Sequence, residues 1–422
     1  MKTIIIVILL GFFALVEKSQ SQPWQVLSSS TTNNITDVEF INSNLGFFSS
    51  SDGVIKRTTD GGISWEIVLS QTIKIYSLYF VNENLGFGSG GFGRIFKTTN
   101  SGLNWIVTAP TGYNLLSIFF TNEFIGYAVG AQSCIIKTTN GGQTWFNQIS
   151  PLTNLALTEV CFSGSKGYIS VSSAYTNLLY TSDGGETWQD GKTRSGSVLS
   201  FSVSFNNSLG YLGGYTSIAT GYNPLLFKTN DNGQTWSDFQ LSSNGKIYSI
   251  SISPVDPSKA CAVGNYINDP VYGNQGLIMR TSDGGQTWSE EQWPGEIKLN
   301  AVHASSTDFF IAGDNGLLLK SSYTVGISSF NSEIPSGYSL GQNYPNPFNP
   351  TTKINFSIPK SGNVKLTVYN LVGQEVSVIL NQNLNVGNYN FDFDASNLNS
   401  GVYFYTLQSE NFRETKRMVL LK

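Results

Sequence analysis

Thr138-Thr-Asn-Gly-Gly-Gln-Thr-Trp145 is one of six related octads that recur between residues 58 and 288. The tryptophans that end the octads lie 40, 40, 43, 48 and 52 residues apart, which is the length of one four-stranded propeller blade. In each octad the third residue, Asp or Asn, bonds backbone amides across a turn, Gly supplies positive φ, and Trp returns to the apolar interior. We therefore assign a structural role to Asp60, Trp65, Asn100, Trp105, Asn140, Trp145, Asp183, Trp188, Asp231, Trp236, Asp283 and Trp288.

A seventh repeat unit lacks its octad. Residues 301–320 read as the first half of a blade, but Ser321-Ser-Tyr-Thr-Val-Gly326 follows without a Trp. Trp24 lies 14 residues before Val38, the same offset that separates the octad tryptophans from the following blades. Residues 24–27 are therefore expected to form the outer strand of blade 7 and to close the ring. The predicted fold is all-β: a seven-bladed β-propeller over residues 22–327, followed by a small C-terminal β-sandwich.

The octads resemble Asp-box (bacterial neuraminidase) repeats. Gly126-Tyr-Ala-Val-Gly130 followed by Ile135-Ile-Lys-Thr-Thr-Asn-Gly-Gly-Gln-Thr-Trp145 resembles the photosystem II assembly-factor-like propellers in particular. The resemblance implies the propeller fold and leaves the function open, because Asp-box propellers serve as sialidases, xyloglucanases, receptors and assembly factors. A photosystem role rests on the family name alone and fits poorly with the export predicted below.

The N-terminus has the pattern of a secretory signal peptide. Lys2 precedes an apolar run over residues 4–16, which is too short for a membrane span, and small residues at Ser19 and Ser21 suit cleavage before Gln22. No second long apolar stretch follows. We expect residues 1–21 to be removed and the mature chain to have no membrane span.

The C-terminus differs in texture from the repeats. A turn-rich linker over residues 328–341 precedes a segment, residues 342–422, of short alternating strands and stacked turns. This segment resembles the type A C-terminal sorting domain of the type IX secretion system. The residues that carry the resemblance include Asn343, Pro345, Asn346, Pro347, Phe348, Asn349, Pro350, Gly401, Tyr403 and Lys416. The resemblance implies a bacterium of the Bacteroidetes and Chlorobi kind, the type IX machinery as partner, and delivery through the periplasm to the outer-membrane surface or the medium.

Composition excludes several functions. One His and three Cys among 422 residues give little material for a metal or cofactor site, and we predict neither. A net charge of -4 gives no electrostatic attraction to nucleic acid. Cys134, Cys161 and Cys261 lie in different blades and are expected to be buried free thiols, with a Cys134–Cys161 pair as the alternative.

A glycoside hydrolase of the sialidase or xyloglucanase type is the alternative function. A sialidase-like site needs three converging arginines, and the propeller has only Arg57, Arg94, Arg194 and Arg280. An inverting site needs two carboxylates separated by roughly 6.5–9.5 Å. Asp37 and Glu159 occupy one repeat position in blades 1 and 4 and are the catalytic candidates. Blades 1 and 4 lie nearly opposite one another in a seven-fold ring, so a non-catalytic role is favoured.

Two features suit a binding role instead. The loops between the second and third strands of blades 4, 5 and 6 are enlarged, and Tyr and Asn on a rigid scaffold suit recognition of a glycan or protein. The ligand-binding candidates in these loops are Tyr175, Tyr215, Tyr222, Asn223, Tyr266, Asn268, Asp269 and Tyr272. Their alternative role is packing within their own loops. A basic residue also precedes most octads; it either attracts anions or covers apolar surface with its stem, and the second role is favoured.

Overall fold

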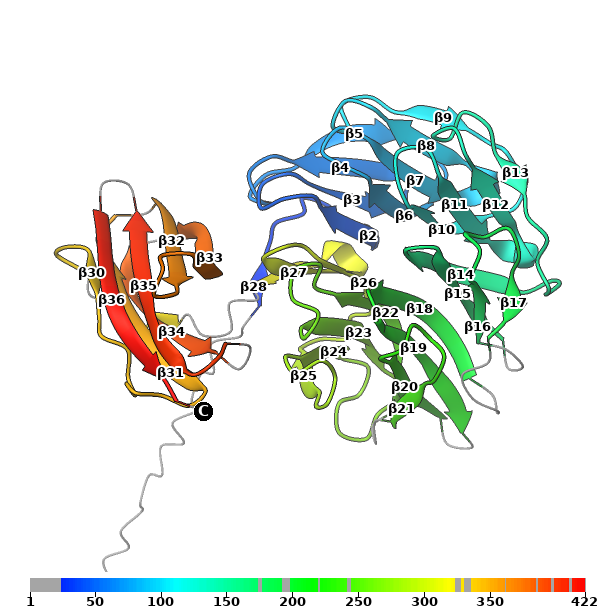
Figure 1. Ribbon diagram of the computed structural model, residues 1–422. Helices are drawn as coiled ribbons and strands as arrows, with labels where there is room; N and C mark the ends of the chain where they lie inside the picture. Colours follow the sequence, from blue (N-terminus) through cyan, green and yellow to red (C-terminus); the bar gives the residue numbers. More distant parts are fainter. Residues whose placement is uncertain are drawn as a thin grey trace, which may run out of the picture.

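The computed structural model describes residues 24–173, 177–191, 198–218, 221–240, 244–322, 328–329, 335–360, 362–384, 386–395, 398–409 and 412–421. In this part of the chain the regular elements are β-strands and three short 3-10 turns, η1 (Gly91–Gly93), η2 (Ala131–Ser133) and η3 (Asp314–Gly316). Seven four-stranded antiparallel sheets surround a common axis as blades (Figure 1). The predicted all-β class and propeller architecture are confirmed.

The strands of each blade follow one another outward from the ring axis. Blade 1 contains β2 (Ile35–Phe40), β3 (Gly46–Ser50), β4 (Val54–Thr58) and β5 (Glu66–Ser70), and blade 2 contains β6 (Ile75–Phe80), β7 (Gly86–Gly90), β8 (Ile95–Thr98) and β9 (Ile106–Thr108). Blade 3 contains β10 (Leu115–Phe120), β11 (Gly126–Gly130), β12 (Ile135–Thr138) and β13 (Phe146–Asn147), and blade 4 contains β14 (Ala156–Ser163), β15 (Lys166–Ser172), β16 (Leu178–Thr181) and β17 (Gln189–Asp190). Blade 5 contains β18 (Val198–Asn206), β19 (Leu209–Ile218), β20 (Gly221–Thr229) and β21 (Ser237–Gln240), and blade 6 contains β22 (Gly245–Ile252), β23 (Ala260–Tyr266), β24 (Gly276–Thr281) and β25 (Ser289–Trp293).

Blade 7 is built from both ends of the propeller. It contains β26 (Leu299–Ala304), β27 (Asp308–Gly313), β28 (Leu318–Ser322) and, as its outer strand, β1 (Gln25–Val26), which pairs with Leu319 and Lys320. Trp24 is buried, its Nε1 donates to Glu291 at 2.8 Å, and the Arg280 guanidinium lies 5.4 Å from the centre of its ring. The predicted closure by residues 24–27 is confirmed, and it removes the open sheet edge that an unclosed ring would present.

Aromatic stacks join the blades. Phe40 of blade 1 stacks on Phe310 of blade 7 with ring centroids 3.5 Å apart, and Phe120 of blade 3 stacks on Phe87 of blade 2 at 3.7 Å. A glycine begins the second strand beneath each such ring, because a Cβ on Gly126 would lie 2.5 Å from Cε1 of Phe120. The hydrophobic core therefore runs from blade to blade around the ring.

The two faces of the ring carry different loops. Because the strands of a blade alternate in direction, the octad turns lie on one face, here called the octad face. The loops between second and third strands lie on the other, the loop face, beside the first residues of the innermost strands. Each of the seven innermost strands has a β-bulge near this end. A bulge turns its extra residue out of the regular alternation, so seven side chains are re-aimed near the loop face.

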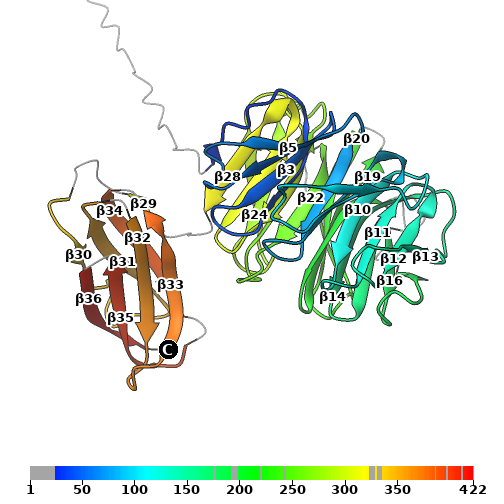
Figure 2. The ribbon, with the colours of Figure 1, turned by 90° about the horizontal axis from the view of Figure 1, so that it is seen from above.

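The C-terminal strands form two sheets (Figure 2). One sheet contains β29 (Ser328–Ser329), β34 (Gly387–Asp394), β31 (Thr351–Ile358) and β30 (Ser339–Leu340). The other contains β33 (Glu375–Leu384), β32 (Gly362–Tyr369), β35 (Gly401–Ser409) and β36 (Phe412–Leu420). Ile354 and Ile358 from one sheet share a buried cluster with Leu366, Tyr405 and Met418 from the other, so the sheets pack face to face as a β-sandwich.

Candidate functional site

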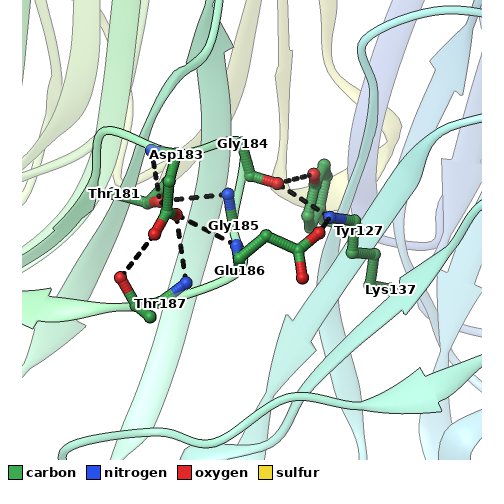
Figure 3. A network of polar contacts seen from close by, with 8 residues as sticks. All are labelled: Tyr127, Lys137, Thr181, Asp183, Gly184, Gly185, Glu186 and Thr187. Atoms are coloured by element: carbon green, nitrogen blue, oxygen red, sulfur yellow. Dashed lines mark hydrogen bonds and ion pairs between the residues drawn. The ribbon is translucent and has the colours of Figure 1, made fainter.

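The octads are internally satisfied turns. In blade 4, Oδ1 of Asp183 accepts hydrogen bonds from the Thr181 hydroxyl at 2.6 Å and the Thr187 amide at 3.0 Å, and Oδ2 accepts from the Thr187 hydroxyl at 2.6 Å (Figure 3). Asp60, Asn100, Asn140, Asp231 and Asp283 make the matching bonds in their own turns. Hydrogen bonds from Thr235 lower the pKa of Asp231 to about 2. These carboxylates hold the turns, which accounts for their recurrence.

The octad tryptophans lie beneath the aromatic stacks. Trp145 meets the ring of Phe120 edge-on at 6.0 Å, and Trp188 meets Phe162 in the same way at 5.9 Å. Matching edge contacts are made by Trp65, Trp105, Trp236 and Trp288. The octad residues thus serve turn geometry and core packing.

The basic residues before the octads join neighbouring blades. Nε of Arg57 donates to the Ser101 carbonyl at 2.8 Å, and Nζ of Lys97 donates to the Gly141 carbonyl at 2.7 Å. Lys97 also lies 5.7 Å from the centre of the Phe87 ring. These cations are held by carbonyls and aromatic faces of the protein itself, which supports the packing role over an anion-attracting ring.

Asp37 and Glu159 occupy a position that links consecutive blades. Oδ2 of Asp37 accepts from the Leu78 amide of blade 2 at 2.7 Å, and Oε2 of Glu159 accepts from the Val203 amide of blade 5 at 2.8 Å. Serine hydroxyls make the same bond from Ser117, Ser202 and Ser249. Burial raises the pKa of both carboxyl groups to about 7. A role that serine also fills is a structural one, so the geometry gives these carboxyls no distinct catalytic task.

His303 lies on the neighbouring innermost strand. Its Nδ1 is 2.9 Å from Oε2 of Glu39, and its Nε2 is 3.0 Å from the Phe40 carbonyl. Burial opposes protonation of the ring, but the Glu39 carboxylate outweighs it, and the pKa of His303 is raised. His303 therefore joins blade 7 to blade 1. Among the described residues, no group of three or more His, Cys, Asp or Glu could hold a metal ion, and Cys134, Cys161 and Cys261 are free and buried.

Several of the predicted ligand-binding residues in blade 6 are used inside their own loop. Tyr266 is fully buried and stacks at 4.7 Å on Tyr272, while Asp269 accepts from the amides of Asn244, Val271 and Tyr272. The Asn268 amide donates to Asn274 at 2.9 Å. These contacts shape the loop, and buried Tyr266 and Asp269 present little surface to a ligand.

The blade 5 candidates lie on an extended hairpin. Tyr215 and Tyr222 come from β19 and β20, and Asn223 pairs with Thr216 in the same hairpin. The two tyrosine rings meet edge-on at 5.1 Å. Tyr175 of blade 4 lies outside the described residues.

Tyr215 and Tyr222 belong to a larger group that we call the lysine–tyrosine cluster. Lys246, from the start of β22, places its Nζ 4.3 Å from the centre of the Tyr215 ring and 3.8 Å from that of Tyr222. Tyr248, the bulge residue of blade 6, stacks near Phe201 at 5.4 Å and lies under Nζ of Lys298 at 4.0 Å. The cluster therefore consists of Phe201, Tyr215, Tyr222, Lys246, Tyr248 and Lys298, brought together from blades 5, 6 and 7 on the loop face.

The cluster concentrates positive charge. Burial lowers the pKa of Lys246, and burial together with the nearby Lys74 and Lys246 lowers that of Lys298 against the attraction of Asp314. Across the part of the chain that the structure describes, none of these three lysines has a carboxylate within ion-pairing distance. Ammonium groups without a salt-bridge partner, set among aromatic faces, can receive an anionic ligand that also offers apolar surface.

Sequence reasoning missed Lys246, Lys298, Phe201 and Tyr248. A signal was present, because Lys74, Lys246 and Lys298 stand at one repeat position, immediately before the paired part of the innermost strand. The analysis of basic residues followed the octads instead, and only the bulges show that side chains at this end turn toward the loop face.

The predicted sorting residues hold the C-terminal sandwich together. Asn343 is buried and donates to the Pro345 carbonyl and the Thr352 hydroxyl, while Oδ1 of Asn346 accepts from the Val419 amide at 2.9 Å. Phe348 is buried in the core. Gly401 pairs with Leu420, Tyr403 donates to the Asn399 carbonyl, and Lys416 forms an ion pair with Glu414. Pro347 follows a cis peptide bond, Asn349 is exposed, and the Pro350 carbonyl accepts from Ala395.

These features define the class of the protein: a closed seven-bladed propeller with octad turns, followed by a small sandwich. The chain belongs to the photosynthesis system II assembly factor YCF48 family, whose profile matches residues 16–108, 99–190 and 171–289, more than half of its length. The secretion system C-terminal sorting domain profile matches residues 342–421. The chain thus carries an export signal at its C-terminus.

Solved structures share the fold at low identity. A structure of YCF48 bound to a D1 peptide is 18% identical, with a TM-score of 0.56 over 71% of this chain and 96% of that one. YCF48 from Cyanidioschyzon merolae is 18% identical, with a TM-score of 0.54 over 71% and 98%. The GH74 xyloglucanase from Xanthomonas campestris is 12% identical, with a TM-score of 0.56 over 79% and 59%. A comparison with curated protein sequences found no match. Within the described residues no helix has the length and apolarity to cross a membrane.

Proposed function

We propose that this chain is an exported, non-catalytic binding propeller that recognises an acidic glycan or protein through the lysine–tyrosine cluster. The observation that carries the proposal is Lys246, whose ammonium lies between the rings of Tyr215 and Tyr222 without a carboxylate partner. A YCF48 structure contains a bound peptide, so a peptide ligand is compatible with this fold.

The cluster suits recognition better than chemistry. Lys246 and Lys298 supply charge, and the faces of Tyr222, Tyr248 and Phe201 supply apolar contact on a rigid scaffold. Their positions in the bulged strands and the extended hairpin of blade 5 preorganise them, which lowers the entropy lost on binding.

We further propose the route of export. Residues 1–21 direct the chain to the periplasm, the 328–341 linker separates propeller from tail, and the type IX machinery recognises the 342–422 domain, as its sorting-domain match indicates. The propeller then acts at the outer-membrane surface or in the medium.

A binding screen tests the ligand proposal. The chain that begins at Gln22 is applied to arrays of acidic and neutral glycans and of acidic and neutral peptides, and affinities are measured for the hits. Lys246→Met and Lys298→Met are each expected to weaken binding at least tenfold. Lys259→Met, which removes a cation paired with Asp256 on the octad face, serves as the matched control and should bind normally.

A polysaccharide hydrolysis screen separates the hydrolase alternative, which the GH74 neighbour keeps in view. Product release that Asp37→Ala or Glu159→Ala abolishes would replace the binding proposal with an enzyme. Binding that survives both lysine variants would remove the cluster from the proposal.

A further inference from the structure

The interface between blades 3 and 4 provides a pattern against which the others can be compared. The Gly184 carbonyl accepts two hydrogen bonds, one from the Tyr127 hydroxyl and one from Nζ of Lys137 at 2.8 Å (Figure 3). The lysine lies 5.4 Å from the centre of the Tyr127 ring and also bonds Glu186 at 2.6 Å. A cation from one blade thus fills the space below the next octad.

The interface between blades 4 and 5 lacks this cation. Tyr180 takes the place of Lys137, and its hydroxyl turns to Gln189 of its own blade at 2.8 Å. The Tyr180 ring lies against Gly191, where a Cβ would be 2.9 Å from the ring. The Asn232 carbonyl, which corresponds to that of Gly184, accepts from the Tyr168 hydroxyl at 2.7 Å and receives no lysine.

A cavity of about 440 Å³ occupies this interface, with Tyr168, Tyr180, Asn232, Gln234 and Trp236 in its lining. The corresponding cavity between blades 3 and 4, which has Lys137 in its lining, is about 290 Å³. The larger space therefore coincides with the missing cation. It retains the acceptor carbonyl and the aromatic ring over which the ammonium lies in the neighbouring interface.

We infer that the cavity between blades 4 and 5 is a binding site for a primary alkylammonium group. The ammonium donates to the Asn232 carbonyl and lies over the Tyr168 ring, as Lys137 does at Gly184 and Tyr127. The amide oxygen of Gln234 stands where Glu186 accepts from Lys137, and Trp236 covers the alkyl stem. This site is separate from the lysine–tyrosine cluster, and its ligand has the opposite charge.

The lining also contains one charged residue of each sign. Lys166 stands where the blade 3–4 cavity has Ile125, and Asp190 lies across from it in the same lining. The two charges offset one another, so recognition rests on the carbonyl and the aromatic faces. Lys166→Ile removes the like charge and is expected to tighten amine binding.

The ammonium can come from a free amine or from a lysine side chain of a partner. Calorimetric titration of the full chain with n-butylammonium and cadaverine tests the first source, and titration with an unstructured lysine-containing peptide tests the second. Saturable binding of either kind, absent with n-butanol or butyrate, supports the site. No saturable binding of any of these amines would overturn it.

Tyr180→Lys restores the pattern of the other interfaces and is the decisive variant. Its own ammonium should fill the cavity, weaken amine binding at least tenfold and raise the melting temperature. Tyr180→Phe keeps the cavity and should bind amines normally. Lys137→Ala opens an equivalent space between blades 3 and 4 and should gain a second site, visible as a rise in melting temperature with added n-butylammonium. Undiminished amine binding by Tyr180→Lys would refute the assignment.

Discussion

The Oδ2 atom of Asp37 lies 2.7 Å from the backbone nitrogen of Leu78, so a carboxyl on blade 1 caps an amide of blade 2. Serine fills the same position in blades 3, 5 and 6. We therefore expect Asp37→Ser to keep the link between blades. Asp37→Ala leaves the amide without an acceptor and should be less stable than Asp37→Ser by about 1–3 kcal/mol. Equilibrium unfolding in urea measures the difference, and equal stabilities would argue against the link.

The raised pKa of Asp37 predicts a pH-dependent stability. Burial raises the pKa from 3.8 to about 7, so between these pH values the folded chain binds a proton that the unfolded chain has released. Stability then falls as pH rises through this window and levels off above it, by at most about 4 kcal/mol. Asp37→Asn does not titrate, so its stability advantage over the wild type should grow from pH 4 to pH 7. A gap that shrinks over this range would contradict a raised pKa.

Gly126 tests the aromatic stacks between blades. A methyl group there would lie 2.5 Å from the Phe120 ring, which itself stacks on Phe87. Gly126→Ala should therefore destabilise the chain by about 1–3 kcal/mol through overpacking. Gly112 has no atom within 4 Å of its Cβ position, so Gly112→Ala is the control and should be neutral. Thermal unfolding distinguishes them; equal melting temperatures would mean that the Phe120 ring yields freely.

Trp24 tests the closure of the ring. Its side chain is 5% exposed and bonded to Glu291 of blade 6, whereas Val26 on the same short strand is 58% exposed. Trp24→Ala is expected to cost about 3–5 kcal/mol, and Val26→Ala should cost little. Hydrogen exchange should then quicken in β28, the partner of the closing strand. Unchanged exchange in β28 of Trp24→Ala would show that closure does not depend on this residue.

The sorting domain can be tested in cells. Deletion of residues 337–422 should trap the propeller in the periplasm, since the export signal lies in the removed segment. Leu371→Ser, at an exposed residue of the sandwich, should be exported normally. Fractionation and surface labelling give the readout, and surface delivery of the truncated chain would refute the sorting role.

The features that the sequence predicted are local or repeated. The octads combine turn chemistry and a buried Trp within eight residues, and the offset of Trp24 from Val38 revealed the closing strand because every blade repeats it. The lysine–tyrosine cluster was missed because it depends on bulges and on the meeting of three blades. Tyr266 was misjudged because alternation along β23, extended by its enlarged loop, turns that ring into the core.

Closure by β1 also constrains when the chain can finish folding. Gln25 pairs with Lys320, so 320 − 25 = 295 residues must be synthesised after the closing strand before its partner exists. At about 5–20 residues per second this takes about 15–60 s. During that interval the first strand has no native neighbour, and blades 1 to 6 can assemble only as an open arc. An exported chain must therefore bring both of its distant ends into one compartment before the ring becomes a stable particle.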